Sequence, residues 1–165
     1  LCFFESLCKV LEWQEYVYRS LPPIKNNPRY FGHQWFVDDQ GNILGEENRM
    51  LLTSTLLTVE EISQKVSELK GLLIPAHVDR MHYSIVGQLG FIPEKLKIDA
   101  VEFSKAITEE EFKKTFCDMN KYTLITSSDA HCLQEMVYQK TFFFIESLNF
   151  SFIVSSNQVI AKLFP

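Results

Sequence analysis

A series of short apolar runs, separated by helix signals, most constrains the fold of this 165-residue chain. Each run is too short for a helix and too uniformly apolar for a half-exposed strand, which is typical of strands buried on both faces of a parallel sheet. Helical connections between such strands favour right-handed parallel crossovers. We therefore predict an α/β fold in which four strands are parallel neighbours in chain order: LLIPAH (72–77), DAVEFS (99–104), YTLIT (122–126) and KTFFFI (140–145).

The helices are predicted from periodicity and capping signals. An apolar stripe indicates a helix over Glu5 to Leu21, which Pro22-Pro23 ends. Two capping boxes begin further helices, Thr58 with Glu61 and Thr108 with Glu111. The first helix is expected to run to Lys70 and close at Gly71, and the second to run to about Met119. The other expected elements are helices in 48–57, 84–89, 130–138 and 155–163, and two short strands around the turn 40–42.

Composition indicates one globular domain over residues 1–165, with 46% hydrophobic residues. The net charge of -5 and the lack of a basic run argue against a nucleic-acid partner. No stretch approaches the roughly 18 apolar residues of a membrane span. The scattered cysteines, none in a CxxC pair, indicate reduced thiols and a cytoplasmic location. Because the chain opens on the apolar run LCFF (1–4), we expect it to be a fragment of a longer domain.

The segment LITSSDAH (124–131) carries the first candidate chemistry. In an extended chain Asp129 and His131 point to the same face, and a carboxylate beside an imidazole suits zinc, manganese or iron. A second interpretation is that Ser-Ser-Asp is a helix N-cap cluster, in which Asp129 caps a helix that begins at Ala130.

Polar side chains recur where other predicted strands end. His77, Asp79 and Arg80 follow one strand, and Glu102 and Ser104 close another. Ligand sites in parallel α/β folds lie beyond the carboxyl ends of the strands. This recurrence favours ligation over capping as the role of Asp129.

The strings LLIPAHVDR, SIVGQLGFIP, DAVEFS and ITSSDAH, in this order, resemble the carboxy-terminal part of the PHP (polymerase and histidinol phosphatase) family of metal-dependent phosphoesterases. The resemblance covers roughly Leu1 to Ile145. It implies a distorted (β/α)7 barrel with a metal cluster at the carboxyl ends of its strands. It also implies that His77, Asp129 and His131 are metal ligands, and that Asp129 and His131 are the catalytic pair.

The chain departs from the family pattern in its missing amino-terminal motifs. It contains no His-x-His, no Asp-His motif with a following bridging glutamate, and no histidine ligand before LCFF; His33 and His82 occupy none of these positions. We therefore expect a single incomplete PHP-like domain over 1–165, the second half of the barrel with mainly parallel strands. Three ligands shared among several metal ions are too few to complete the coordination of those ions. The chain should bind zinc, manganese or iron weakly, should be inactive alone, and should need the missing amino-terminal half as its partner.

The activity implied for the complete protein is metal-assisted hydrolysis of a small phosphate ester. The planar guanidinium of Arg80 suits a phosphate group, although a salt bridge with Asp79 or a helix end is an equally good interpretation. Glu102 is expected to be a solvated strand residue. The alternative function is a degenerate, non-catalytic PHP-like structural or binding module; a nuclease or polymerase-associated editing domain is a weaker third candidate.

Overall fold

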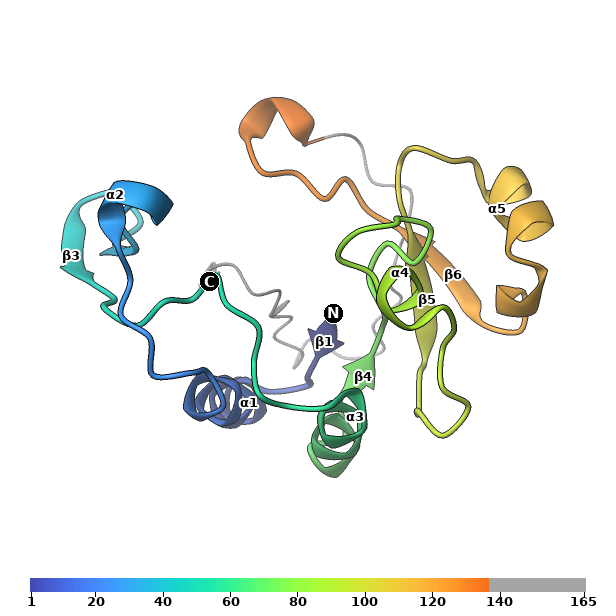
Figure 1. Ribbon diagram of the computed structural model, residues 1–165, viewed down its shortest axis with the longest axis horizontal. Coiled ribbons are helices and arrows are strands. Elements are labelled where there is room, and N and C mark those ends of the chain that lie inside the picture. Colours follow the sequence, from blue (N-terminus) through green and yellow to red (C-terminus); the bar gives the residue numbers. More distant parts are fainter. Residues whose placement is uncertain (137–165) are drawn as a thin grey trace.

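The structure is a computed structural model that describes residues 1–136. Two expected elements, the strand over 140–145 and the helix over 155–163, lie outside the described residues, as does the end of the helix expected over 130–138. Within residues 1–136 the strands form three two-stranded sheets, with the helices arranged around them (Figure 1).

The first part of the molecule packs two helices against a small antiparallel sheet. Strand β1 (Cys2–Phe3) pairs antiparallel with β4 (Leu72–Leu73). Helices α1 (Leu7–Arg19) and α3 (Val59–Glu68) lie side by side below this sheet (Figure 1). They enclose an apolar cluster with β1, made of Cys2, Phe4, Val10, Trp13, Val66 and Leu69.

A long excursion leaves the end of α1 and returns to the start of α3. It carries α2 (Pro28–Phe31) and an antiparallel hairpin of β2 (Trp35–Val37) and β3 (Ile43–Glu46), far from the rest of the molecule (Figure 1). Its two ends meet, because the Leu56 N–H donates a hydrogen bond to the Ser20 carbonyl at 2.9 Å. The excursion is therefore a long insertion between α1 and α3, and without it the two helices would still be adjacent.

The second part of the molecule is built on a parallel pair of strands. Strand β5 (Ala100–Phe103) pairs parallel with β6 (Thr123–Thr126). Around them lie α4 (Ile85–Leu89), α5 (Glu109–Thr115) and two 3₁₀ turns, η1 (Cys117–Met119) and η2 (Leu133–Glu135). Their main core cluster contains Val78, Ile92, Leu96, Val101, Phe103, Phe112 and Met119.

The two parts are joined through the segment that follows β4. Leu73 accepts a backbone hydrogen bond from Asp99, and Pro75 accepts one from Glu102 at 3.0 Å. The segment therefore runs in the same direction as β5. One buried cluster joins β1, the residue after β4, β5 and β6, and it consists of Phe3, Ile74, Ala100 and Ile125. Pro75 has no N–H and His77 takes a φ of +33°, so the bonding does not continue as a regular ladder.

The predicted fold class is wrong: residues 1–136 do not form half of a (β/α)7 barrel with mainly parallel strands. Two of the three sheets are antiparallel, whereas a barrel needs each strand to pair on both sides in one closed sheet. The physical reason lies in LLIPAH, which forms only a two-residue strand and pairs with β1 in the opposite direction. Of the predicted parallel neighbours, the β5–β6 pair is confirmed.

Most helix predictions are confirmed and two are wrong. Both capping boxes are present, and α1, α3, α4 and α5 form where they are expected, although α5 stops at Thr115 and is followed by η1. Residues 48–57 form no helix, and Leu56 is 74% exposed. Residues 130–136 contain only the short turn η2 in place of the start of a helix.

The end of helix α3 also differs from the prediction that the helix closes at Gly71. Lys70 takes the left-handed backbone, with a φ of +54°, whereas Gly71 does not. Gly71 is needed for close packing, since a Cβ there would lie 2.5 Å from the Phe4 ring and 2.8 Å from the Phe3 carbonyl oxygen.

In the described part of the chain no helix is long and apolar enough to cross a bilayer. The longest helix, α1, has 13 residues, against the roughly 20 apolar residues that a span requires.

Candidate functional site

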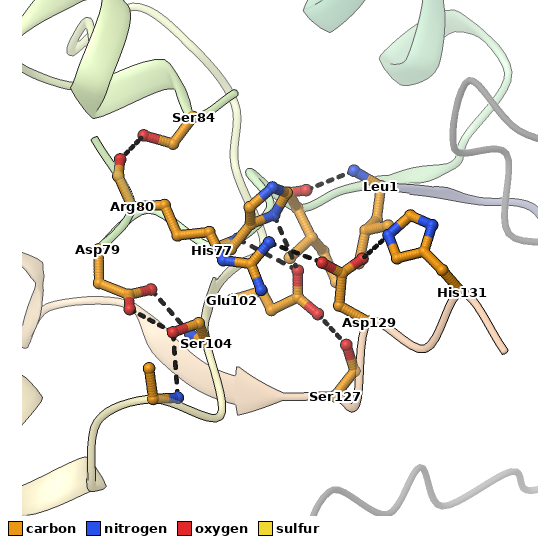
Figure 2. Close-up of polar contacts among 12 residues, drawn as sticks. Leu1, His77, Asp79, Arg80, Ser84, Glu102, Ser104, Ser127, Asp129 and His131 are labelled. Atoms are coloured by element: carbon orange, nitrogen blue, oxygen red, sulfur yellow. Dashed lines mark hydrogen bonds and ion pairs between the residues drawn. The ribbon is translucent and has the colours of Figure 1, made fainter. Parts of the chain in front are cut away.

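Three segments converge where the parallel strands end. Because β5 and β6 pair in register, with Phe103 opposite Thr126, the residues after them leave the sheet at the same edge. The segment after β4 lies along β5 at this edge, where the Val78 N–H donates a hydrogen bond of 2.9 Å to the Glu102 carbonyl. Figure 2 shows the side chains that these three segments bring together.

Glu102 and His77 form the buried part of the site. The Glu102 side chain is only 5% exposed. Its Oε2 accepts the backbone N–H of His77 at 3.2 Å and lies 3.8 Å from Nδ1 of the His77 ring. Its Oε1 accepts the hydroxyl of Ser127, which follows β6. Glu102 therefore links the segment after β4 to the segment after β6, and the expectation that it is a solvated strand residue is wrong.

Asp129, Arg80 and His131 form the more open part of the site. Arg80 Nη1 donates to Asp129 Oδ2 at 2.7 Å, and the side chains of these two residues are 38% and 35% exposed. His131 Nε2 lies 3.7 Å from the other carboxylate oxygen, Asp129 Oδ1. Arg80 therefore forms a salt bridge, as one of the two interpretations expected, but its partner is Asp129 rather than Asp79.

The capping interpretation of Asp129 is not supported. Asp129 takes a φ of +47°, and its carboxylate contacts the Arg80 and His131 side chains. The His131 backbone N–H donates to Glu135 Oε2 at 2.7 Å, and this hydrogen bond lowers the pKa of Glu135. The backbone around η2 is therefore held by Glu135.

Asp79 fixes the loop between β4 and α4. Its two carboxylate oxygens accept the backbone N–H of Ser104 at 2.7 Å and the Ser104 hydroxyl at 2.6 Å (Figure 2). Both oxygens of the Asp79 carboxylate are therefore occupied by Ser104. Asp79 ties the loop that carries Arg80 to the end of β5.

Two predicted ligands have a backbone conformation that is rare for residues with a side chain. His77 and Asp129 have positive φ angles of 33° and 47°. Such conformations cost about 1–3 kcal/mol each and are concentrated at functional sites, although Asp and His tolerate them better than most residues. At position 77 the Glu102 carboxylate accepts the backbone N–H, and at position 129 Arg80 binds the side-chain carboxylate.

Among the described residues, the geometry suits two protein ligands to one cation better than three. Two ligands of one tetrahedral ion lie roughly 3.4 Å apart, which is close to the 3.7 Å between Asp129 and His131. His77 Nδ1 is buried and has no hydrogen-bond partner. Among residues 1–136, however, no three His, Cys, Asp or Glu side chains are close enough to hold one ion. These side chains alone therefore do not complete a metal site.

The other histidines contact residues outside this arrangement, and three of the four cysteines, Cys8, Cys117 and Cys132, are exposed. His33 pairs with Glu46 and stacks on Trp35 in the β2–β3 hairpin. His82 contacts the exposed Tyr83. Cys132 is an exposed free thiol beside His131.

The sequence interpretation missed the importance of Glu102. All four residues of β5 are buried, so the alternation that separates inward from outward residues is absent. The charge of Glu102 within an apolar run could have indicated its importance. Burial of a carboxylate in a parallel strand costs free energy unless hydrogen-bond partners compensate.

Comparison with known proteins finds no matching family model and no matching solved structure. One stretch of 95 residues is 28% identical to a Bacillus subtilis (strain 168) protein that carries the name "Uncharacterized protein YqxK". The match covers 54% of this chain and 24% of that protein. The chain therefore spans about a quarter of the length of the curated relative that it matches.

Proposed function

We propose that this chain contributes to the site of a metal-dependent phosphoesterase of the PHP type, which its motifs resemble, and that the complete protein hydrolyses a small phosphate ester. The observation that carries the proposal is the arrangement around Asp129, whose carboxylate contacts an imidazole at 3.7 Å and a guanidinium at 2.7 Å. A carboxylate and an imidazole side by side suit a divalent cation, and a guanidinium beside them suits the anionic substrate.

Asp129 and His131 are the residues that would hold the metal, with His77 as a further ligand. A bound zinc, manganese or iron ion would supply an activated water as the nucleophile near neutral pH. Arg80 directs one of its five N–H donors at Asp129, so the others are able to bind phosphate oxygens. Asp129 also orients this guanidinium, which lowers the entropy cost of binding the substrate.

The chain alone should bind metal weakly and should be inactive. Even an open catalytic zinc site generally has three protein ligands, and Asp129 already has its charge neutralised by Arg80. We therefore propose that further ligands come from parts of the protein outside residues 1–136.

A second candidate function is a non-catalytic module that has lost its metal. The ion pair between Arg80 and Asp129 favours this candidate, since the guanidinium occupies one oxygen of a proposed ligand. In that case the ion pair is a structural link between two loops rather than part of a substrate site.

We also propose a cytoplasmic location. Cys2, Cys8, Cys117 and Cys132 are all free thiols. Free thiols in a chain of this size are typical of a reducing compartment.

The experiment measures bound metal and hydrolysis of p-nitrophenyl phosphate in the complete protein that contains this chain, with Mn²⁺ or Zn²⁺ supplied. Asp129→Asn and His131→Ala should lower both metal content and hydrolysis. Asn is chosen at position 129 because it tolerates a positive φ as Asp does. His33→Ala in the distant hairpin is the matched control and should change neither quantity. If the complete protein holds metal but Asp129→Asn and His131→Ala hydrolyse as fast as the His33→Ala control, the site is elsewhere. If it holds no metal, the non-catalytic module is the better account.

A further inference from the structure

The structure assigns a positioning role to Glu102: we propose that its buried carboxylate fixes the tautomer and orientation of the His77 ring, with the proton on Nδ1 and with Nε2 free to accept a cation. This inference deepens the proposed function, because it concerns how one of its ligands is presented. Glu102 itself does not touch metal or substrate.

Burial is the first observation that supports the assignment. The Glu102 side chain is 5% exposed within a strand whose four residues are all buried. An ionised carboxylate in such a place is costly unless hydrogen-bond donors surround it. A buried charge at the edge of the candidate site therefore needs an explanation that strand packing alone does not supply.

The partners of the two oxygens are the second observation. Oε2 accepts the His77 backbone N–H at 3.2 Å, and Oε1 accepts the Ser127 hydroxyl. With one oxygen bound to each flanking segment, the carboxylate is fixed against rotation. Figure 2 shows the Glu102 carboxylate between the His77 ring and Ser127.

The position of the imidazole gives the tautomer. His77 Nδ1 is buried, lacks a hydrogen-bond partner and lies 3.8 Å from Glu102 Oε2. A lone pair on Nδ1 would face the negative oxygen, whereas an N–H there would place a positive hydrogen between the two atoms. The Nδ1–H tautomer is therefore favoured electrostatically, and a small closing movement would make it a hydrogen bond. A carboxylate that holds one imidazole N–H in this way raises the basicity of the other nitrogen toward a metal.

Asp99, which directly precedes the same strand, offers a matched control at its other end. Its carboxylate accepts the backbone N–H of Leu73 at 2.9 Å, as Glu102 accepts that of His77. Both carboxylates thus tie β5 to the segment over 72–78. Only Glu102 lies beside an imidazole, so a purely structural role predicts similar effects for the two positions.

The test is long-range ¹H–¹⁵N NMR of the histidine rings in the metal-free chain, in mildly alkaline buffer. The wild-type His77 ring should show the Nδ1–H pattern, and Glu102→Gln and Glu102→Ala should lose it. Asp99→Asn should keep it. The rings of His33, His82 and His131 serve as internal references for intact folding. If Glu102→Ala fails to fold, the wild-type pattern and the nearly isosteric Glu102→Gln still decide the question.

An Nε2–H pattern in the wild type, or a His77 pattern that is unchanged in Glu102→Gln, overturns the assignment. So does equal loss in Asp99→Asn. A separate Mn²⁺ titration of the same variants tests the proposed function: the affinity should fall about ten- to a hundredfold without Glu102. If no Mn²⁺ binds to any variant, the metal proposal loses its support while the ring pattern still decides the role of Glu102.

Discussion

At the scale of single residues, Arg80 has two roles that compete: an ion pair with Asp129 and the proposed binding of phosphate. Its guanidinium neutralises Asp129 at 2.7 Å, yet the same side chain is the proposed phosphate-binding group. A cation that binds Asp129 has to compete with this ion pair. The pair is partly exposed, so its contribution is modest, about 0.2–1 kcal/mol.

Arg80→Gln should therefore tighten the binding of Mn²⁺ to the chain, by about two- to fivefold. The reason is that the substitution removes the competing positive charge and leaves the Asp129 carboxylate in place. Isothermal titration with Mn²⁺ measures the change. Arg29→Gln on α2 makes the same change of net charge at an exposed position and should have no effect. Weaker binding in Arg80→Gln would show that Arg80 orients Asp129 for the metal instead of competing with it.

At the scale of elements, capping boxes begin the helices α3 and α5. Thr58 and Thr108 each accept the N–H of a glutamate three residues later, and that glutamate accepts the threonine N–H in return. Thr58→Ala and Thr108→Ala should each lower the free energy of unfolding by about 1 kcal/mol. Urea denaturation measures the loss, with Ser54→Ala in the exposed loop before α3 as the control. Equal stability of the capping variants and the control would contradict the assigned role of the caps.

These boxes also make stability depend on pH. The pKa of Glu61 is lowered mainly by the Thr58 backbone N–H, and that of Glu111 mainly by the Thr108 side chain. A lowered folded-state pKa means that the stabilisation is present above the ordinary value of 4.5 and is lost as the pH falls through the folded-state value. Unfolding measured from pH 7 down to acid should show a shallower loss in the Glu61→Gln, Glu111→Gln double variant than in the wild type. An identical slope would contradict this account.

Gly71 lets the end of α3 pack closely against β1, and a substitution tests this packing. Gly71→Ala should lower the free energy of unfolding by about 1–3 kcal/mol, because the new methyl would overlap the Phe4 ring and the Phe3 carbonyl. Gly45→Ala in β3 is the control, since its methyl would meet Phe36 at an ordinary 3.6 Å. Thermal unfolding of the two variants separates them; an undisturbed Gly71→Ala protein would show that β1 and the end of α3 are less tightly packed than described.

Local elements were predictable because their signals lie within a few residues. Thr58 with Glu61 and Ser84 with Gly90 mark helix ends in the sequence and in the structure. The segment 48–57 was misjudged because Leu52 and Leu56 are exposed, which composition does not reveal. The site was predictable only in part. The closeness of Asp129 and His131 was expected from an extended chain, but β6 ends at Thr126 and Asp129 takes a φ of +47°, so the contact does not arise from an extended strand. The partners of Glu102 and Arg80 depend on the long-range approach of β4, β5 and β6.

The strand pairing decides the architecture at the scale of the whole molecule. The alternation of strands and helices predicted the parallel pair β5–β6 but not the antiparallel pairing of β1 with β4. The direction in which a two-residue strand pairs depends on the route of the chain through α1, the excursion and α3. No local signal encodes that route, so the barrel prediction was wrong.

The excursion should be dispensable for folding. Its hairpin residues Trp35, Phe36 and Val37 are each more than half exposed, and its ends meet through Ser20 and Leu56. Replacement of residues 24–54 by a short glycine-rich linker should preserve cooperative unfolding. The expected loss is about 1–2 kcal/mol, from the contacts of Tyr18 with Glu47 and Arg49. Circular dichroism during urea unfolding checks this; a non-cooperative transition would show that the excursion is part of the core.

The central claim, that Asp129 and His131 are metal ligands, is tested most directly by electron paramagnetic resonance of Mn²⁺ titrated into the chain. Protein-bound Mn²⁺ reduces the signal of the free ion, so the method detects weak binding without any need for activity. The account predicts weak binding in the wild type, its loss in Asp129→Asn and His131→Ala, and wild-type binding in the control Asp99→Asn, whose carboxylate lies at the opposite end of β5. Equal binding by Asp129→Asn and the wild type would contradict the account.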